Sequence, residues 1–297
     1  MTAPNEPAGM LPASEAPPGG MEAEAPAVGR PGRGRAIARG VAAFLFWGMV
    51  QSVVAVPPAA VGTALGALVG VGFLWWYVVR HDYPGERRRR ATLRLRAPGP
   101  ILAWVPLVLV LAVAFAAATL VLAARVLPLP QSDTFQYFER MPHGMIPLAL
   151  LAVWLAPMME EFLFRGWLQR NLERRLPAAR AIVVTAVVFA AAHFDVFGFP
   201  SRFVVGTASG YLAWASGSIV PSVLLHAAYN GTLLLVDQLP GNLDDDALVR
   251  WARAPRVLAG AALLAMTSAA GLVWTLRRAA ATAGAVRGWR RIAGPRR

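Results

Sequence analysis

The amino-acid sequence predicts an all-α, polytopic integral membrane protein with about eight transmembrane helices. Hydrophobic residues make up 57% of the 297 residues and charged residues only 15%, whereas a soluble domain usually carries nearer a quarter charged residues. Several apolar runs approach or reach the ~20 residues that a helix needs to cross a bilayer. Cysteine is absent, which excludes disulfides and thiolate chemistry.

The eight predicted helices follow from the apolar runs and the Pro and Gly residues that interrupt them. The fourth helix is longer than a membrane span and should project from the bilayer, whereas the sixth is short enough to leave its full crossing open. The expected ranges are 37–56, 61–79, 101–124, 145–176, 180–197, 203–216, 219–236 and 257–276.

Three regions are expected along the chain. Residues 1–36 form a disordered cytoplasmic segment, because the stretch up to residue 29 is rich in Pro, Ala, Gly and Glu and cannot build a core. The transmembrane domain occupies 37–278, with its most polar part at about 145–236. Residues 279–297 form a basic cytoplasmic tail.

The orientation follows from the arginines. All 29 basic residues are arginine and the net charge is +13. With eight spans, the arginine-dense loops fall on one side of the membrane, as the positive-inside rule expects. We therefore expect a multi-pass protein of the cell membrane with both termini in the cytoplasm. This placement between spans explains the charge better than nucleic-acid binding does, so the lipid bilayer is an expected partner and nucleic acid is not.

Several polar residues lie inside the predicted spans, where ionisable groups are costly and usually functional. Glu160, Glu161 and Arg165 occur in "EEFLFR". Glu161 and Arg165 are four residues apart on one helix, so they can form an ion pair. Glu160 is rotated by about 100° from Glu161 and faces a different neighbour.

The remaining polar residues come from two later helices. His193 ends "FAAAH", and His226 and Asn230 stand four apart in "HAAYN", so the last two can point into one site. Counted from the turn at Pro177, Glu160 and His193 each lie ~25 Å away along antiparallel helices. We expect the two to meet at one level, in the inner half of the membrane.

Two chemistries fit this set of side chains. In one, no cofactor is required: Glu160 acts as general base toward water, while His and Asn donors stabilise an oxyanion. In the other, Glu160, His193 and His226 bind a divalent metal such as zinc and leave a position for water. A purely structural role, as an ion pair and polar packing, explains Glu161 and Arg165 but not the other four residues.

These residues resemble three motifs of the CPBP intramembrane proteases, which comprise the CAAX prenyl endopeptidases and bacterial Abi-type relatives. E-E-x-x-x-R corresponds to "EEFLFR", F-x-x-x-H to "FAAAH" and H-x-x-x-N to "HAAYN". All three occur in order, within about residues 145–236.

The resemblance implies an intramembrane endopeptidase that cuts a membrane-associated protein or peptide. It implies that Glu160 activates water with His193 as its partner, that His226 and Asn230 hold the oxyanion, and that Glu161 and Arg165 support the site. It leaves open whether the substrate is prenylated. The competing hypotheses are a proton-coupled transporter, which also uses membrane Glu and His residues, and a non-catalytic scaffold that keeps the polar core.

Overall fold

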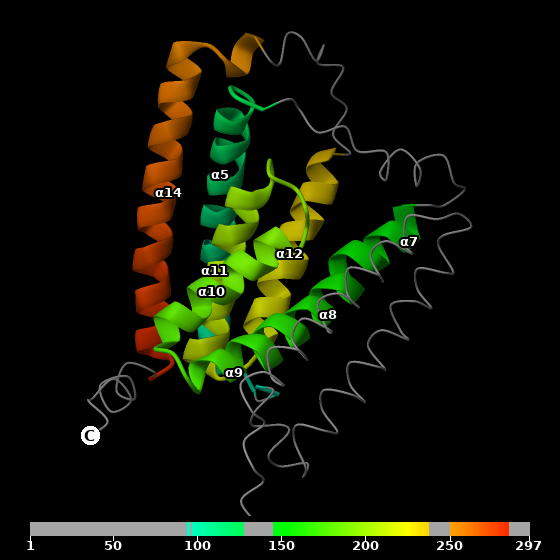
Figure 1. The fold of residues 1–297 in the computed structure, drawn as a ribbon, viewed down its shortest axis with the longest axis vertical. Helices are drawn as coiled ribbons and strands as arrows, with labels where there is room; N and C mark the ends of the chain where they lie inside the picture. The colour runs from blue at the N-terminus through cyan, green and yellow to red at the C-terminus, as the bar shows by residue number, and fades with distance from the viewer. Residues whose placement is uncertain (1–93, 96, 128–144, 238–249, 285–297) are drawn as a thin grey trace, which may run out of the picture.

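The computed structural model describes residues 94–95, 97–127, 145–237 and 250–284 (Figure 1). The predicted helices 37–56 and 61–79, the segment 1–36 and most of the tail 279–297 lie outside these ranges. Within them the chain is helical and contains no strand, so the all-α class is confirmed for this part of the protein.

The helices fall close to their predicted positions. The third begins as a 3₁₀ turn, η2, and continues as α5; the fifth to eighth correspond to α10, α11, α12 and α14. Their bounds are Gly99–Trp104 for η2, Val105–Ala123 for α5, Ala178–Ala191 for α10, Phe199–Ser216 for α11, Val220–Asp237 for α12 and Pro255–Thr282 for α14.

The fourth predicted helix runs without a break but widens into a π-helix twice. It passes through α7 (Met145–Ala149), η3 (Leu150–Leu155), α8 (Ala156–Glu161), η4 (Phe162–Leu168) and α9 (Gln169–Glu173). Both η3 and η4 are π-helical, a rare form that occurs frequently at functional sites. We call this whole run, from Met145 to Glu173, the motif helix. The spacing pattern predicted one regular helix here and did not predict its two wide segments.

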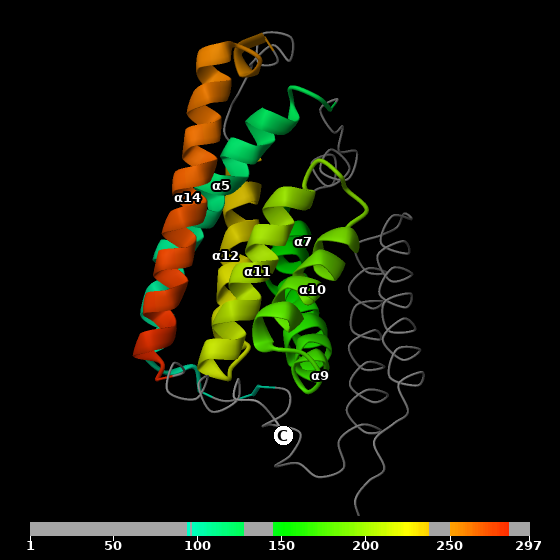
Figure 2. The same ribbon diagram turned by 60° about the vertical axis from the view of Figure 1, so that its left-hand side comes forward.

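Packing divides the helices into two groups that meet at α11 and α12. The helices α5 and α14 lie side by side, and α10 packs against α11 (Figures 1 and 2). A buried apolar cluster joins α11 and α12 to η2, α5 and α14, and its largest members include Ile101, Leu212 and Leu225. The motif helix packs against α12 on the opposite side from α14. This arrangement brings all three motifs to one place.

The predicted helix 180–197 was too long at its C-terminal end. The helix α10 ends at Ala191, and residues 192–198 form turns before α11 begins at Phe199. Phe194 has a positive φ of 51°, which a helix cannot contain. The Asp195 carboxylate accepts the backbone N–H of Gly198 at 3.0 Å, a local bond that competes with helix formation. His193 therefore lies on a turn just beyond α10 rather than inside a helix.

Two described helices are long and apolar enough to cross a membrane, at Gly99–Ala123 and Pro255–Thr282. The helices at Ala178–Ala191 and Val220–Val236 are apolar but shorter. The described ranges thus support two of the eight predicted spans by length and composition, and α11 is not among them.

Candidate active site

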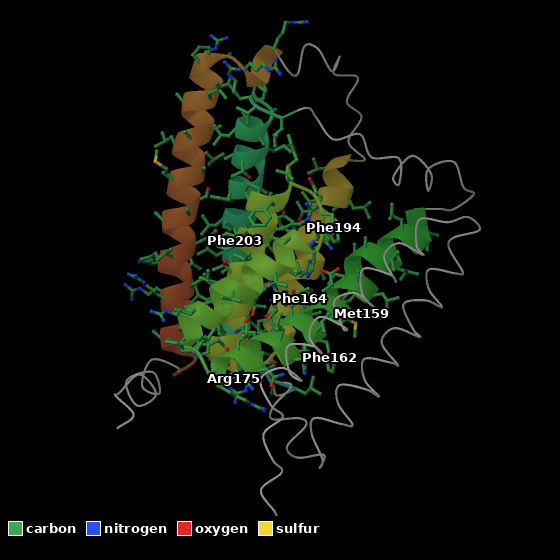
Figure 3. All side chains as sticks on the ribbon, in the orientation of Figure 1. Met159, Phe162, Phe164, Arg175, Phe194 and Phe203 are labelled. Carbon is green, nitrogen blue, oxygen red and sulfur yellow. The ribbon has the colours of Figure 1, made fainter. Side chains whose placement is uncertain are left out.

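The three motifs converge from the motif helix, the turn after α10 and α12. In Figure 3, Met159, Phe162 and Phe164 follow one another along the motif helix, and Phe194 marks the turn that carries His193. Glu160, Glu161 and Arg165 are buried, with at most 4% of their surface exposed. The structure thus brings the first motif against the histidines of the other two.

Glu161 connects the first motif to the third. Its Oε1 atom accepts a hydrogen bond from Nη1 of Arg165 at 2.7 Å and lies 2.9 Å from Nδ1 of His226. Both Glu161 and Arg165 are fully buried. The ion pair expected from their spacing is therefore present, and it fixes the His226 ring by holding its Nδ1 atom.

Phe189, the aromatic residue of the second motif, lies at the centre of this cluster. The guanidinium carbon of Arg165 is 4.4 Å from the Phe189 ring centroid, a favourable cation–π distance. The same ring makes edge-on contacts with His193 and His226, at centroid distances of 4.9 and 5.5 Å. Phe189 therefore positions all three polar side chains at once.

The motif helix approaches α11 closely because two glycines face it. The carbonyl of Gly206 accepts a hydrogen bond from Arg165, and that of Gly210 accepts one from Gln169. A Cβ atom at Gly206 would lie 3.1 Å from Phe189, and one at Gly210 would lie 2.7 Å from the Gln169 amide oxygen. No role for Gln169 or for these glycines was predicted from the sequence. The signal available there was a pair of four-residue spacings, Arg165 to Gln169 on one helix and Gly206 to Gly210 on the other, each of which places its two residues on one face.

Glu160 faces both histidines. Its Oε2 atom lies 3.7 Å from Nε2 of His193 and 3.9 Å from Nε2 of His226. These separations are too long for direct hydrogen bonds. Oε2 is buried and has no hydrogen-bond partner among the described residues. Counting residues from the turn at Pro177 predicted that Glu160 and His193 would meet, and the structure does place these two side chains together.

The partners of the two Nδ1 atoms determine which ring nitrogen of each neutral histidine carries the proton. Nδ1 of His193 lies 2.8 Å from the Phe189 carbonyl, and Nδ1 of His226 faces the Glu161 carboxylate. A carbonyl or carboxylate can only accept, so each neutral ring carries its proton on Nδ1. Both Nε2 atoms then present lone pairs toward the Glu160 carboxylate. Three acceptors cannot satisfy one another, whereas a water molecule, which donates two protons, can bond to two of them.

Asn230 lies one helical turn from His226, but its amide is used elsewhere. Nδ2 donates to the Ala152 carbonyl in η3 at 2.8 Å. The expectation that Asn230 and His226 point into one site is met only in part, because this bond directs the amide toward the π-helical segment. One amide proton of Asn230 remains for a further acceptor.

The metal alternative can be tested on the same side chains. Within the described ranges, no group of three or more His, Asp or Glu residues is arranged to hold a metal ion. Glu160, His193 and His226 are close, but their donor atoms do not form such a ligand set. We therefore derive no step of the reaction through a metal.

A second buried polar cluster lies below the site and was missed from the sequence. Arg94 donates to both carboxylate oxygens of Glu173 at 2.6 Å, and Gln169 donates to the same carboxylate at 2.9 Å. The Arg94 carbonyl accepts the N–H of Ile219, which precedes α12. Arg94 has a positive φ of 58°. It stands in an arginine-rich stretch, so nothing in the local pattern distinguished it from solvated arginines.

Arg202 is a further cation beside the site that was not predicted. It pairs with Asp195 on the turn that carries His193. Arg202 precedes Gly206 by about one turn on α11, and His193 follows Phe189 by four residues just beyond the end of α10. Because α10 and α11 are antiparallel and Gly206 lies against Phe189, Arg202 and His193 lie at the same level. Arg202 interacts electrostatically with both Glu160 and His193.

Comparison with known proteins supports the motif assignment. Residues 142–232 match a family model described as type II CAAX prenyl endopeptidase, Rce1-like. No curated protein and no solved structure matches the chain significantly. The matched segment contains Glu160, Glu161, Arg165, His193, His226 and Asn230. The segment that carries all three motifs is therefore Rce1-like, in agreement with the CPBP resemblance, and that family is one of membrane-embedded proteases.

Proposed function

We propose that this protein is an intramembrane endopeptidase that hydrolyses a peptide bond of a membrane-associated protein or peptide. The observation that carries the proposal is the buried Oε2 atom of Glu160, which faces Nε2 of His193 and of His226 at 3.7 and 3.9 Å. Three acceptor atoms at these distances favour a bound water molecule, and water is the second reactant in peptide hydrolysis.

In the proposed reaction, Glu160 accepts a proton from this water as it attacks the substrate carbonyl. The acid form of Glu160 then donates the proton to the departing amine, which leaves Glu160 ionised for the next cycle. His193 orients the water through Nε2, and its bond to the Phe189 carbonyl fixes the ring. The low exposure of the carboxylate supports this role, because a dry site strengthens such interactions.

Stabilisation of the oxyanion is assigned to His226 and Asn230. Nε2 of the neutral His226 ring accepts in the resting site, so we propose that this ring takes up a proton from solvent when substrate binds and then donates from Nε2 to the oxyanion. The Glu161 carboxylate at Nδ1 is the partner that the charged ring requires. Asn230 contributes the amide proton that does not bond to Ala152. Each such donor aimed at a developing oxyanion contributes about 10²–10³ in turnover.

We further propose a multi-pass topology with both termini in the cytoplasm and the site in the inner half of the membrane. The described helices support this arrangement, because α9, the start of α5 and the end of α14 lie at one end of the structure (Figures 1 and 2). Arg174, Arg175 and Arg180 are exposed at that end, as the positive-inside rule expects for the cytoplasmic face.

The test is hydrolysis by purified protein in detergent, with Glu160→Gln as the inactive variant and Arg170→Gln as a matched surface control. The probes are S-farnesylated cysteine peptides and the same peptides without the lipid, followed by mass spectrometry in H₂¹⁸O. One ¹⁸O atom in the new carboxylate of the wild-type product, with none formed by Glu160→Gln, is the expected result. Equal product from the two proteins would refute the role of Glu160.

A further inference from the structure

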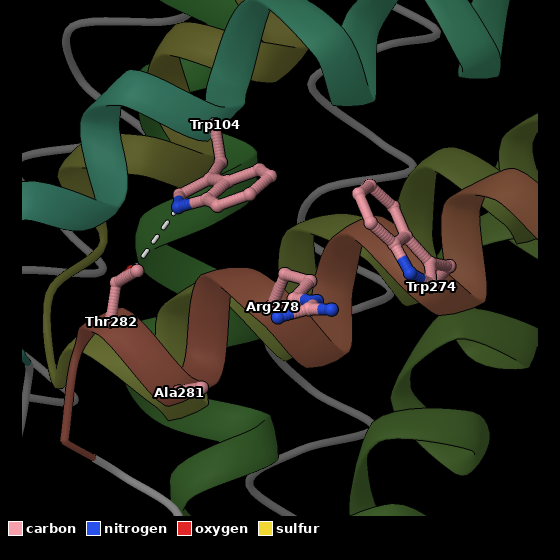
Figure 4. Close-up of a pocket in the computed structure, with 5 residues that line it drawn as sticks. All are labelled: Trp104, Trp274, Arg278, Ala281 and Thr282. Atoms are coloured by element: carbon pink, nitrogen blue, oxygen red, sulfur yellow. Dashed lines mark hydrogen bonds between the residues drawn. The ribbon is translucent and has the colours of Figure 1, made fainter.

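A groove that contains none of the proposed active-site residues lies between η2, which leads into α5, and the end of α14. It has a volume of about 440 Å³, and its lining consists of Trp104, Trp274, Arg278, Ala281 and Thr282 (Figure 4). It lies at the same end of the molecule as α9 (Figure 1). The two helices that form it are the two that are long and apolar enough to span a membrane.

The walls of the groove are held in place by the protein. The Trp104 indole N–H donates to Oγ1 of Thr282 at 3.1 Å, and the Thr282 hydroxyl donates to the Ala279 carbonyl at 2.7 Å. The Trp104 and Trp274 rings meet edge to face at a centroid distance of 6.4 Å. The two contacts of Trp104 therefore link the two helices at the groove.

The described residues of the groove include donors for an anion and no carboxylate that would repel one. The Arg278 guanidinium carbon lies 5.5 Å from the Trp274 ring centroid, and Arg278 is exposed. Among the described residues, no carboxylate pairs with Arg278 and none lines the groove. The Trp274 indole N–H likewise has no acceptor within the described ranges. A phosphate could therefore contact a cation and a neutral donor together.

Apolar side chains are exposed on both helices that form the groove. Trp274, Val273 and Met266 on α14 are 51–63% exposed, and Leu107 on α5 is 40% exposed. Hydrocarbon chains would cover this surface, whereas a soluble phosphate compound would not. Tryptophan and arginine at the end of a spanning helix are typical of the membrane interface, and basic pockets between spanning helices are known to bind anionic lipid head groups.

We infer that this groove binds the phosphate of an anionic phospholipid, with the acyl chains along α5 and α14. The inference concerns a site separate from the proposed hydrolysis and does not depend on it. One arginine at a membrane surface contributes about 1 kcal/mol toward an anionic lipid, which corresponds to about fivefold in affinity.

The experiment is native mass spectrometry of the full chain in detergent with palmitoyl-oleoyl phosphatidylglycerol, phosphatidylcholine or glycerol 3-phosphate. Wild type should retain phosphatidylglycerol at several times the occupancy of phosphatidylcholine. Arg278→Gln should lower that preference about fivefold, Arg278→Lys should keep most of it, and Trp274→Phe should lower it in part. Arg256→Gln, the same charge change at the opposite end of α14, is the control.

Each outcome decides the inference. Equal retention of the two lipids by wild type, retention of neither, or equal losses in Arg278→Gln and Arg256→Gln would overturn it. Binding of glycerol 3-phosphate as strong as that of the lipid would identify a soluble phosphate as the ligand and would also overturn it. Because Arg278 is exposed, its substitution should leave the melting temperature unchanged, and a melting curve of each variant confirms that the comparison is made on folded protein.

Discussion

Glu161 and His226 join two motifs that are far apart in the sequence, through a contact of 2.9 Å between a fully buried carboxylate and an imidazole Nδ1. The same carboxylate oxygen accepts the Arg165 guanidinium at 2.7 Å. This contact makes the two adjacent glutamates different in role. Glu161 neutralises a buried cation and orients a ring, whereas Oε2 of Glu160 has no hydrogen-bond partner among the described residues and is open to a reactant.

The first prediction concerns Glu160. Glu160→Gln should lower kcat by at least about 10²–10⁴-fold, because an amide of the same shape cannot accept the proton of water. The melting temperature should change little. Turnover of a cleaved peptide and a melting curve in detergent measure the two effects, and a variant with full turnover would contradict the general-base role.

The second prediction concerns the buried ion pair. Arg165→Ala should destabilise the protein by about 3–5 kcal/mol, since it leaves the Glu161 carboxylate buried without its partner. Arg170→Ala, on the same helix, removes a cation that is 43% exposed and should cost at most about 1 kcal/mol. Denaturation in mixed micelles compares the two. Similar stabilities would show that Arg165 is not the neutralising group for Glu161.

The third prediction concerns Arg94, which lies outside the segment that matches the protease family. Arg94→Ala and Glu173→Gln should each destabilise the protein. The double variant should be less destabilised than the sum, because the two side chains form one buried pair with 4% and 6% exposure. A double-mutant cycle on unfolding measures the coupling. Additive effects would mean that the pair contributes nothing beyond its separate side chains.

The fourth prediction separates the two chemistries considered for the site. Activity should survive a strong chelator, because in the proposed reaction Glu160 activates the water directly and no step requires a metal. Asn230→Ala should lower kcat by about 10²–10³ through loss of an oxyanion donor, with little change in KM. Loss of activity on chelation, followed by recovery with added zinc, would contradict the general-base proposal.

The fifth prediction tests the topology. A cysteine introduced within 170–176 should react with an impermeant maleimide from the cytoplasmic side, and one within 240–250 from the outside. The wild-type chain has no cysteine, so every label reports the introduced position. The opposite pattern of labelling would reverse the orientation and move the site to the outer half of the membrane.

Features that depend on the geometry of individual helices could be predicted from the sequence. The ion pair of Glu161 and Arg165 follows from a four-residue spacing, and the meeting of Glu160 with His193 follows from counting along two antiparallel helices. Both depend only on the rise and twist of a helix, so they could be predicted.

The errors arose where contacts between distant segments decided the geometry. The turn at 192–198 depends on Asp195 and on the positive φ of Phe194, which interrupt an otherwise apolar stretch. The direction of the Asn230 amide depends on a carbonyl of the motif helix. Arg94 became a buried residue only because Glu173 and the start of α12 enclose it. None of these partners can be identified from a local pattern.

The two π-helical segments of the motif helix affect how its register should be compared between relatives. A π segment accommodates one residue more per turn than an α-helix, so it can arise from, or be removed by, a change of one residue in length. Deleting one residue from Leu150–Leu155 would convert the wide turn into an α-helical turn, so the segments on either side would keep their register while the carbonyls within the turn change direction. The Ala152 carbonyl would then no longer face Asn230. A relative with a gap of one residue there should have lost that hydrogen bond while retaining all three motifs.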